Sequence, residues 1–252
     1  MSWKHSLWRM MSRCVGRPAG RAGLRVLGYH AVGTEIPADP YGLSSRPDVF
    51  ARQMELVASG RFGRPISLSG AKLDGSAEIS VTFDDGYLDT LTTAAPILAR
   101  LCLPFTVCVT PGLLDEGRPH LSWPELKELS LVPGCEIGAH GLTHARLDAL
   151  DDAQLSRELS ESRRRLEDAL GRPVAVMTWP HGAASRRAAA AARAAGFTRA
   201  GCSLYGVNDS NRDSLLLKRT EIVAFDDERD FIGKISGIWD WYALRQDDPA
   251  EQ

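Results

Sequence analysis

The sequence lacks several features that define specialised classes of protein. It contains only five cysteines in 252 residues, an odd number without a Cys-x-x-Cys pair, which argues against a disulfide scaffold and favours a reducing compartment. No apolar run approaches the roughly 20 residues that span a bilayer. The 30 basic and 32 acidic residues give a net charge of −2, whereas a nucleic-acid binder is usually basic. The remaining composition, 44% hydrophobic and 25% charged, is that of an ordinary globular domain.

The first 34 residues depart from this charge balance because they carry six basic residues and no acid. Within them, residues 3–15 place Trp3 and other apolar residues at three- and four-residue steps, which predicts an amphipathic helix. Such a basic helix suits either the plane of a membrane interface or a cap on one end of the core, and arginines interrupt its apolar face too often for a signal peptide. We expect a basic helix and lead-in over residues 1–23, one folded domain over residues 24–252, and a cytoplasmic protein that can contact the inner membrane face.

After the lead-in, strand-like and helix-like segments alternate about seven times. The predicted strands are residues 24–29, 79–83, 105–109, 135–139, 174–178, 198–202 and 215–222. The predicted helices are residues 47–60, 89–101, 123–129, 152–170 and 185–195, with a further helix after residue 226. This alternation predicts an α/β fold, either a deformed and incomplete (β/α) TIM-like barrel of parallel strands, which the length favours, or a doubly wound open sheet. Both folds place their sites at the carboxyl ends of the strands.

Two adjacent carboxylates follow the predicted strand 79–83. They are Asp84 and Asp85, within the sequence Thr-Phe-Asp-Asp-Gly-Tyr. Two ionised carboxylates in one confined site repel each other, and a bound cation removes that conflict. Gly86 permits a sharp turn that can aim both side chains into one cleft. The alternative is that Asp85 or Asp89 only caps the helix that follows.

Histidine is scarce, with six in the chain, and four of the six follow predicted strands. These four are His30, His140, His144 and His181. Because His140 and His144 lie four residues apart, they can bind one ion together with a carboxylate and leave metal positions open for water and substrate. The spare carboxylate can then act as a base. For the histidine pair taken alone, hydrogen bonding of each ring within a loop is the alternative.

The segments TFDDGY (residues 82–87) and HGLTH (residues 140–144) together resemble the polysaccharide deacetylase family, also called the NodB-homology family or carbohydrate esterase family four. The Trp-Pro-His-Gly turn at 179–182 supports the resemblance, which extends from about residue 24 to residue 222. The pair Tyr29-His30 is similar to a motif that one branch of the family carries near its start. The resemblance implies a deformed (β/α) barrel and a metal-dependent hydrolase that removes an N-acetyl group from an amino sugar in glycan or glycoconjugate biosynthesis.

The resemblance also assigns roles to individual residues. The expected metal ligands are Asp85, His140 and His144, and the expected cofactor is Zn²⁺ or another divalent transition metal. Asp84 is the expected general base, and the backbone of His181 is expected to help form an oxyanion hole. No histidine follows His181, so the acid that many members take from a C-terminal motif is expected to be His30, with His181 as the alternative.

Expected substrate contacts come from the residues around these motifs. They are Tyr87, Trp179, Pro180 and Arg219. Many members carry an arginine in the third motif that orients the base. Thr178 and Trp179 occupy that neighbourhood here, and Arg219 is a candidate substitute.

Two other functions use the same residues. A catalytically weakened glycan-binding protein would fit the departures from the family pattern, and a deformylase or another C–N hydrolase could use the same site. The expected partner is an N-acetylated sugar, free, nucleotide-linked or lipid-linked, and not a nucleic acid. The basic N-terminal helix favours a lipid-linked substrate.

Overall fold

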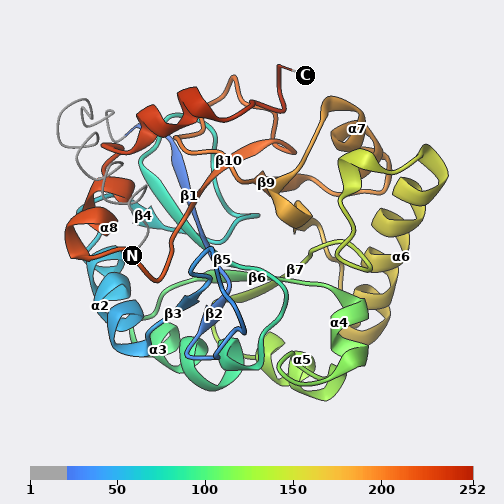
Figure 1. The fold of residues 1–252 in the computed structure, drawn as a ribbon, viewed down its shortest axis with the longest axis horizontal. Helices are drawn as coiled ribbons and strands as arrows, with labels where there is room; N and C mark the ends of the chain where they lie inside the picture. Colours follow the sequence, from blue (N-terminus) through green and yellow to red (C-terminus); the bar gives the residue numbers. More distant parts are fainter. Residues whose placement is uncertain (1–21, 252) are drawn as a thin grey trace.

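The structure is a computed structural model that describes residues 22–251. Seven parallel strands within this range close into a barrel at the centre of the molecule (Figure 1). These strands are β1 (Leu24–Tyr29), β5 (Glu78–Phe83), β6 (Phe105–Val109), β7 (Cys135–Ala139), β8 (Val176–Thr178), β9 (Arg199–Cys202) and β10 (Leu217–Glu221). They follow one another around the barrel in chain order, and β1 closes the ring by pairing with both β5 and β10. The predicted TIM-like barrel is confirmed, with seven strands in place of the usual eight.

Three two-residue strands lie outside the ring. β4 (Arg64–Pro65) pairs with β5, and β2 (Ala31–Val32) pairs with β3 (Ser44–Ser45) in a separate small sheet. The sequence analysis did not predict them, because two residues are too few to show the alternation that marks a strand.

Helices surround the barrel (Figure 1). They are α2 (Pro47–Ala58), α3 (Ala95–Arg100), α4 (Pro111–Glu116), α5 (Trp123–Ser130), α6 (Asp152–Leu170), α7 (Arg186–Ala194) and α8 (Glu228–Ile235). The residues 147–149, 180–182 and 240–245 form short 3₁₀ turns. Of these helices, α4 was not predicted from the sequence. Within residues 22–251, no helix combines the length and the apolar character that crossing a membrane requires.

The longest helix, α6, has the boundaries predicted from its sequence. At its start, the Asp151 carboxylate accepts a hydrogen bond from the Gln154 backbone N–H, and the Gln154 side-chain oxygen accepts one from the Asp151 backbone N–H. At its end, Gly171 adopts the left-handed conformation, which only glycine reaches without strain. Its apolar stripe is buried against the barrel, and this face therefore fixes the helix beside β7.

The other predicted elements differ from the structure mainly at their ends. The predicted helix 89–101 begins as a π-helix (Thr90–Ala94) and continues as α3. The reason is Pro96, which has no N–H to donate and therefore interrupts the regular ladder. The predicted strands 174–178 and 215–222 are shorter in the structure. The predicted N-terminal helix over residues 3–15 lies outside the described residues.

Candidate active site

The site lies where the parallel strands end, and strand register places its residues. Tyr29 of β1 pairs with Phe83 of β5, so His30 and Asp84 leave neighbouring strands at the same level. The Asp84 backbone N–H donates to the Tyr29 carbonyl at 3.0 Å, which extends that pairing by one residue. The His140 N–H donates in the same way to the Val109 carbonyl of β6 at 2.8 Å. Residues distant in the sequence therefore meet at one end of the barrel.

Backbone strain is concentrated at this end. Five non-glycine residues between residues 22 and 251 have a positive φ, and three of them face the site: Asp85 (68°), His144 (62°) and His181 (59°). The left-handed conformation is unfavourable for residues with a Cβ atom, and it persists where surrounding structure enforces it. Such strain is typical of functional sites.

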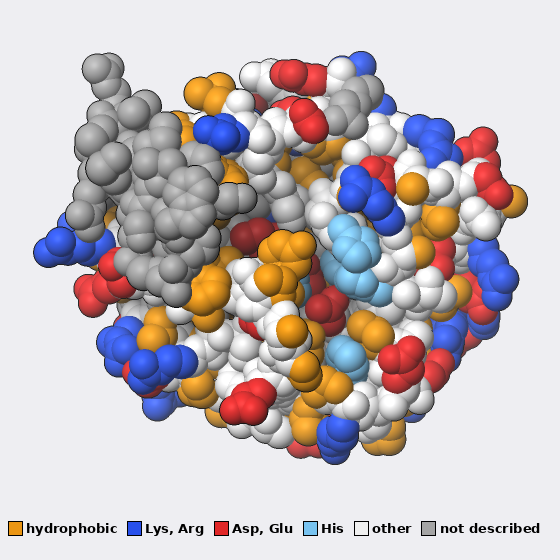
Figure 2. Space-filling model, in the orientation of Figure 1, with side chains coloured by type: hydrophobic (Ala, Val, Ile, Leu, Met, Phe, Trp, Pro, Cys, Tyr) orange, Lys and Arg blue, Asp and Glu red, His pale blue; other side chains and the backbone are white. Residues whose placement is uncertain are grey.

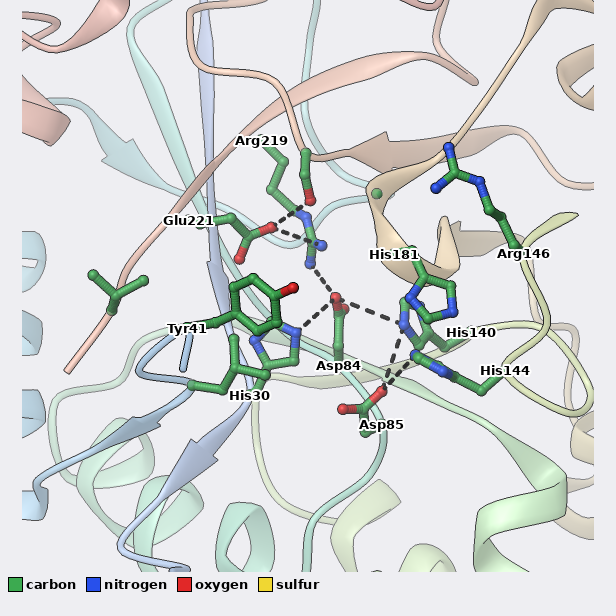
Figure 3. Close-up of a pocket in the computed structure, with 14 residues that line it drawn as sticks. His30, Tyr41, Asp84, Asp85, His140, His144, Arg146, His181, Arg219 and Glu221 are labelled. Carbon is green, nitrogen blue, oxygen red and sulfur yellow. Dashed lines mark hydrogen bonds and ion pairs between the residues drawn. The ribbon is translucent and has the colours of Figure 1, made fainter. Parts of the chain in front are cut away.

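Asp85, His140 and His144 converge as the sequence predicts (Figure 3). Asp85 Oδ1 lies 3.5 Å from His140 Nε2 and 3.4 Å from His144 Nε2, and the three candidate ligand atoms all lie within 4.8 Å of one another. Asp85 Oδ1 is buried and has no hydrogen-bond partner among the described residues. A buried carboxylate oxygen left facing two imidazole nitrogens is a donor set that suits Zn²⁺. These residues therefore fit a metal.

A hydrogen bond to His140 and the burial of His144 favour the forms of the two imidazoles that bind a metal. His140 Nδ1 lies 3.0 Å from the Thr178 carbonyl, which can only accept, so Nδ1 carries the proton and Nε2 is left with its lone pair. For His144, burial and the neighbouring His140 lower the pKa to about 4. His144 is therefore neutral near pH 7, as ligation requires.

Asp84 is held on both oxygens by buried partners. Oδ2 lies 2.7 Å from Arg219 Nη1, and Oδ1 accepts a hydrogen bond of 2.8 Å from the Thr178 hydroxyl. Burial by itself would raise the pKa of Asp84, but the charge of Arg219, that of nearby histidines and the Thr178 hydrogen bond together hold this pKa well below its usual range. Asp84 is therefore ionised at neutral pH, which is the form that a general base needs.

The structure does not place Arg219 as the substrate contact that was predicted for it. Its side chain is only 1% exposed and lies between Asp84 and Glu221, with Nη2 3.0 Å from Glu221 Oε1. The guanidinium borders the cavity, where Nη1 and Nη2 face the two carboxylates and Nε has no hydrogen-bond partner among the described residues. The structure thus places Arg219, on β10, where it can orient the base, and this is the role for which the sequence offered it as a substitute.

The two candidate acids lie on opposite sides of the metal ligands (Figure 3). His30 Nε2 lies 3.8 Å from Asp84 Oδ2, and the His30 side chain is 14% exposed. His30 Nδ1 is buried without a hydrogen-bond partner in the described part of the chain. His181 is exposed on its turn, and its ring lies 4.6 Å from the ring of His144.

Three predicted substrate contacts are corrected by the structure. Trp179 is fully buried, and its Nε1 donates to the Leu215 carbonyl at 2.9 Å. Because side chains alternate at a strand end, Thr178 faces the site and Trp179 faces the core. Pro180 is buried beside it, and Tyr87 packs on the ring of His120 with centroids 4.9 Å apart. None of Tyr87, Trp179 and Pro180 lines the cavity formed by residues 22–251.

Two acidic residues that support the site were not singled out from the sequence. The Glu158 carboxylate, on α6, accepts hydrogen bonds from the backbone N–H groups of Leu142 (2.7 Å) and Thr143 (3.1 Å) and from the Thr143 hydroxyl (2.6 Å). It therefore holds the loop between the two candidate metal ligands His140 and His144. Glu221 holds Arg219. Two patterns in the sequence could have indicated these acids. Glu158 lies on the apolar stripe of α6, and Glu221 lies two residues after Arg219 on the same strand face.

Together these residues form a cavity of about 520 Å³ at the centre of one face. Figure 2 shows histidine and acidic side chains gathered around this hollow. The lining residues are His30, Tyr41, Leu43, Asp84, Asp85, His140, His144, Arg146, His181, Gly182, Ser203, Arg219, Glu221 and Val223. The volume lies in the range of pockets that take small molecules or single units of a larger ligand.

Comparison with known proteins agrees with this geometry. Among solved structures, the fold is similar to the deacetylase PplD of Streptococcus pyogenes in complex with acetate (TM-score 0.75, 21% identity, 87% of this chain and 99% of that one). It is also similar to IcaB from Ammonifex degensii (TM-score 0.72, 21% identity, 87% and 97%). At such identities the likeness shows the fold alone.

A curated relative also matches the sequence, the putative polysaccharide deacetylase YxkH of Bacillus subtilis (strain 168). It is 25% identical over 119 residues, which are 47% of this chain and 42% of the relative. The match therefore covers less than half of the relative's length. Residues 72–200, just over half of the chain, match the sequence model of the polysaccharide deacetylase family. The chain belongs to the polysaccharide deacetylase family.

Proposed function

We propose that this protein is a metal-dependent hydrolase that removes the N-acetyl group from an amino sugar of a glycan or glycoconjugate. The observation that carries the proposal is the meeting of Asp85, His140 and His144 next to an ionised Asp84. The family supports a carbohydrate deacetylase. The metal dependence is inferred from the three side chains that fit an ion.

The metal ligands are Asp85, His140 and His144. When bound, Zn²⁺ or a similar ion would polarise the acyl carbonyl and lower the pKa of an attacking water toward about 7. Asp84 accepts the proton of that water, and its two buried partners, Arg219 and Thr178, keep its carboxylate fixed in direction. The turn at 180–182 brings the backbone of His181 to the cavity, where its N–H donates to the developing oxyanion.

His30 is the proposed acid. It emerges from the strand next to Asp84, and its Nε2 faces the same carboxylate oxygen at 3.8 Å. A proton given by His30 to the sugar nitrogen as the C–N bond breaks yields a free amine and acetate. His181 is the alternative, because it lines the opposite side of the cavity. The structure of PplD was solved in complex with acetate, which is the second product of this reaction.

The cellular setting of the reaction is a further part of the proposal. The odd number of cysteines, without a disulfide framework, favours the reducing cytoplasm. There the acetylated sugar would be a nucleotide-linked, lipid-linked or small amino-sugar intermediate. The basic N-terminal segment supports contact with the membrane and a lipid-linked substrate. These points rest on the sequence.

The test combines metal analysis with acetate release. We expect the purified protein to bind about one equivalent of Zn²⁺ and to release acetate from at least one member of a panel of N-acetylated sugars, both free and conjugated. N-formylated versions of the same sugars separate a deacetylase from a deformylase. Metal binding without release of either acid would contradict the proposed hydrolysis and favour a glycan-binding protein.

A further inference from the structure

The rim of the catalytic cavity carries an aromatic side chain that the proposed mechanism does not use. Tyr41 lines the cavity, and 72% of its surface is exposed. It belongs to the loop between β2 and β3, whereas the metal ligands lie on the floor (Figure 3). An exposed tyrosine offers both a flat apolar ring and a hydroxyl group to a ligand that enters the cavity.

The backbone that presents Tyr41 is fixed on both sides. The Asp39 carboxylate accepts hydrogen bonds from the backbone N–H groups of Tyr41 (3.2 Å), Gly42 (2.7 Å) and Ser44 (3.2 Å). The Gly42 carbonyl accepts a bond of 2.7 Å from Ala224, which follows β10. The ring is thus exposed on a braced loop, so a ligand that contacts it need not order the loop first.

Gly42 is required for this arrangement. Its φ is 71°, and a Cβ atom at this position would lie 2.8 Å from the ring of Phe225. The Phe225 ring therefore packs directly on the backbone next to Tyr41. This contact braces the loop from the β10 side, in addition to the hydrogen bonds.

The two sides of the cavity differ in chemistry. Tyr41 lies on the side of His30, while Arg146 lies on the side of His144 and His181 (Figure 3). Leu43 and Val223 add apolar surface to the cavity. A pyranose ring has the same division, with C–H groups on its faces and hydroxyl groups around its edge. An exposed aromatic ring can stack on the C–H face of such a sugar.

We propose that Tyr41 binds the sugar unit adjacent to the one that is deacetylated, with its ring stacked on the C–H face of that neighbour. The proposal rests on the proposed function and deepens it. When the acetyl group of one sugar unit reaches Asp84 and Asp85 on the floor of the cavity, the next sugar unit of the glycan lies at the rim. Of the substrates considered above, the proposal therefore selects a glycan of at least two units, such as the glycan of a lipid-linked intermediate, over a single or nucleotide-linked amino sugar.

The experiment uses N-acetylglucosamine oligomers of one to five units, in the 1,4- and 1,6-linked series. The affinity of each oligomer for the zinc-loaded full chain is measured by calorimetry, and kcat and KM are measured by acetate release. We expect Tyr41→Ala to weaken binding of the longer oligomers about tenfold, which is the upper range for one aromatic contact. This substitution should raise KM more than it lowers kcat. Its effect should be larger for the oligomer of two sugar units than for the single sugar. Tyr41→Trp, which keeps a flat ring, should restore binding.

Leu131→Ala is the matched control. Leu131 is 82% exposed and lies outside the residues that line the cavity, so its removal should leave all affinities unchanged. Equal affinity of wild type and Tyr41→Ala for every oligomer would overturn the proposal about Tyr41 while leaving hydrolysis intact. Absence of acetate release by wild type, together with weaker oligomer binding by Tyr41→Ala, would contradict the proposed function and support the sugar site.

Discussion

Asp84 Oδ2 and Arg219 Nη1 lie 2.7 Å apart in the interior, where each side chain is only 1% exposed. A charged pair this deeply buried is stable only when further hydrogen bonds compensate for lost water. Thr178 supplies one to Asp84, and Glu221 contacts the other side of Arg219. The result is a carboxylate whose direction is set from two strands, β8 and β10. The proposed base, Asp84, is therefore oriented by an arginine far from the turn in which many family members carry one.

The first prediction concerns the shape of Arg219. Arg219→Lys keeps the positive charge but loses the planar fork that reaches both Asp84 and Glu221. We expect kcat to fall about 10²-fold, because a base displaced by about 1 Å can lose that much, while bound zinc stays near one equivalent. The measurements are kcat and metal content.

Arg193→Lys is the control for that substitution, because Arg193 forms an exposed ion pair with Asp213. It should leave kcat unchanged. Removal of the charge in Arg219→Met should destabilise the fold by about 3–5 kcal/mol, since it leaves the buried Asp84 carboxylate without its cation. Normal turnover by Arg219→Lys would show that the arginine has only a structural role.

The second prediction separates the two adjacent aspartates. Asp84→Asn should retain zinc and lower kcat by about 10²–10⁴-fold, because it removes the base and none of the three ligand atoms. Asp85→Asn should lose zinc, because it removes the buried oxygen that faces both imidazoles. Metal content and kcat of both variants are the measurements. If Asp84→Asn retained normal turnover, the proposed mechanism would be wrong.

The third prediction concerns the loop that joins the metal-binding histidines. Glu158→Gln replaces one of the carboxylate oxygens that accept hydrogen bonds from Leu142 and Thr143 with an N–H donor. We expect the affinity for Zn²⁺ to fall about 10–100-fold, as is typical when a group supporting the ligands is lost. The affinity is measured by competition with a chelator of known strength.

Glu161→Gln is the matched control, because Glu161 lies on the same helix and pairs with Arg157 across one turn of the surface. Its zinc affinity should equal that of wild type. If Glu158→Gln lowered the melting temperature of the metal-free protein but not its zinc affinity, Glu158 would serve the fold and not the metal.

Much of this architecture could be predicted because its signals are local. The strands 24–29, 105–109 and 135–139 and the helix 152–170 have the boundaries that periodicity and capping residues indicate. Parallel strands end at the same side of the barrel, so chemistry-bearing residues after each strand had to meet there. This reasoning correctly brought the aspartate pair, His140 and His144 together, and the family resemblance named Asp85 as the ligand of the pair.

What could not be predicted depends on side-chain direction and on contacts between distant segments. Trp179 follows a strand, as the site residues do, but side chains alternate in direction along β8, so that of Trp179 points into the core. Glu158 reaches the metal loop from a helix, and sequence patterns do not show which buried acid faces which backbone N–H. Arg219 was offered both as a substrate contact and as a substitute that orients the base, because nothing in the sequence decides whether its guanidinium on β10 meets Asp84.

The fourth prediction identifies the acid. His30→Gln should lower kcat for an N-acetyl sugar by about 10²–10⁴-fold with bound zinc unchanged, whereas His181→Gln should have a much smaller effect. An amide needs its leaving nitrogen protonated, but 4-nitrophenyl acetate releases a stable phenolate without a proton. His30→Gln should therefore retain hydrolysis of this ester, while Asp84→Asn, which lacks the base, should lose both reactions. The opposite pattern, in which His181→Gln spares the ester and loses the amide, would assign the acid to His181. Loss of ester and amide hydrolysis together in His30→Gln would show that His30 acts on the base, which lies 3.8 Å away, and not on the leaving group.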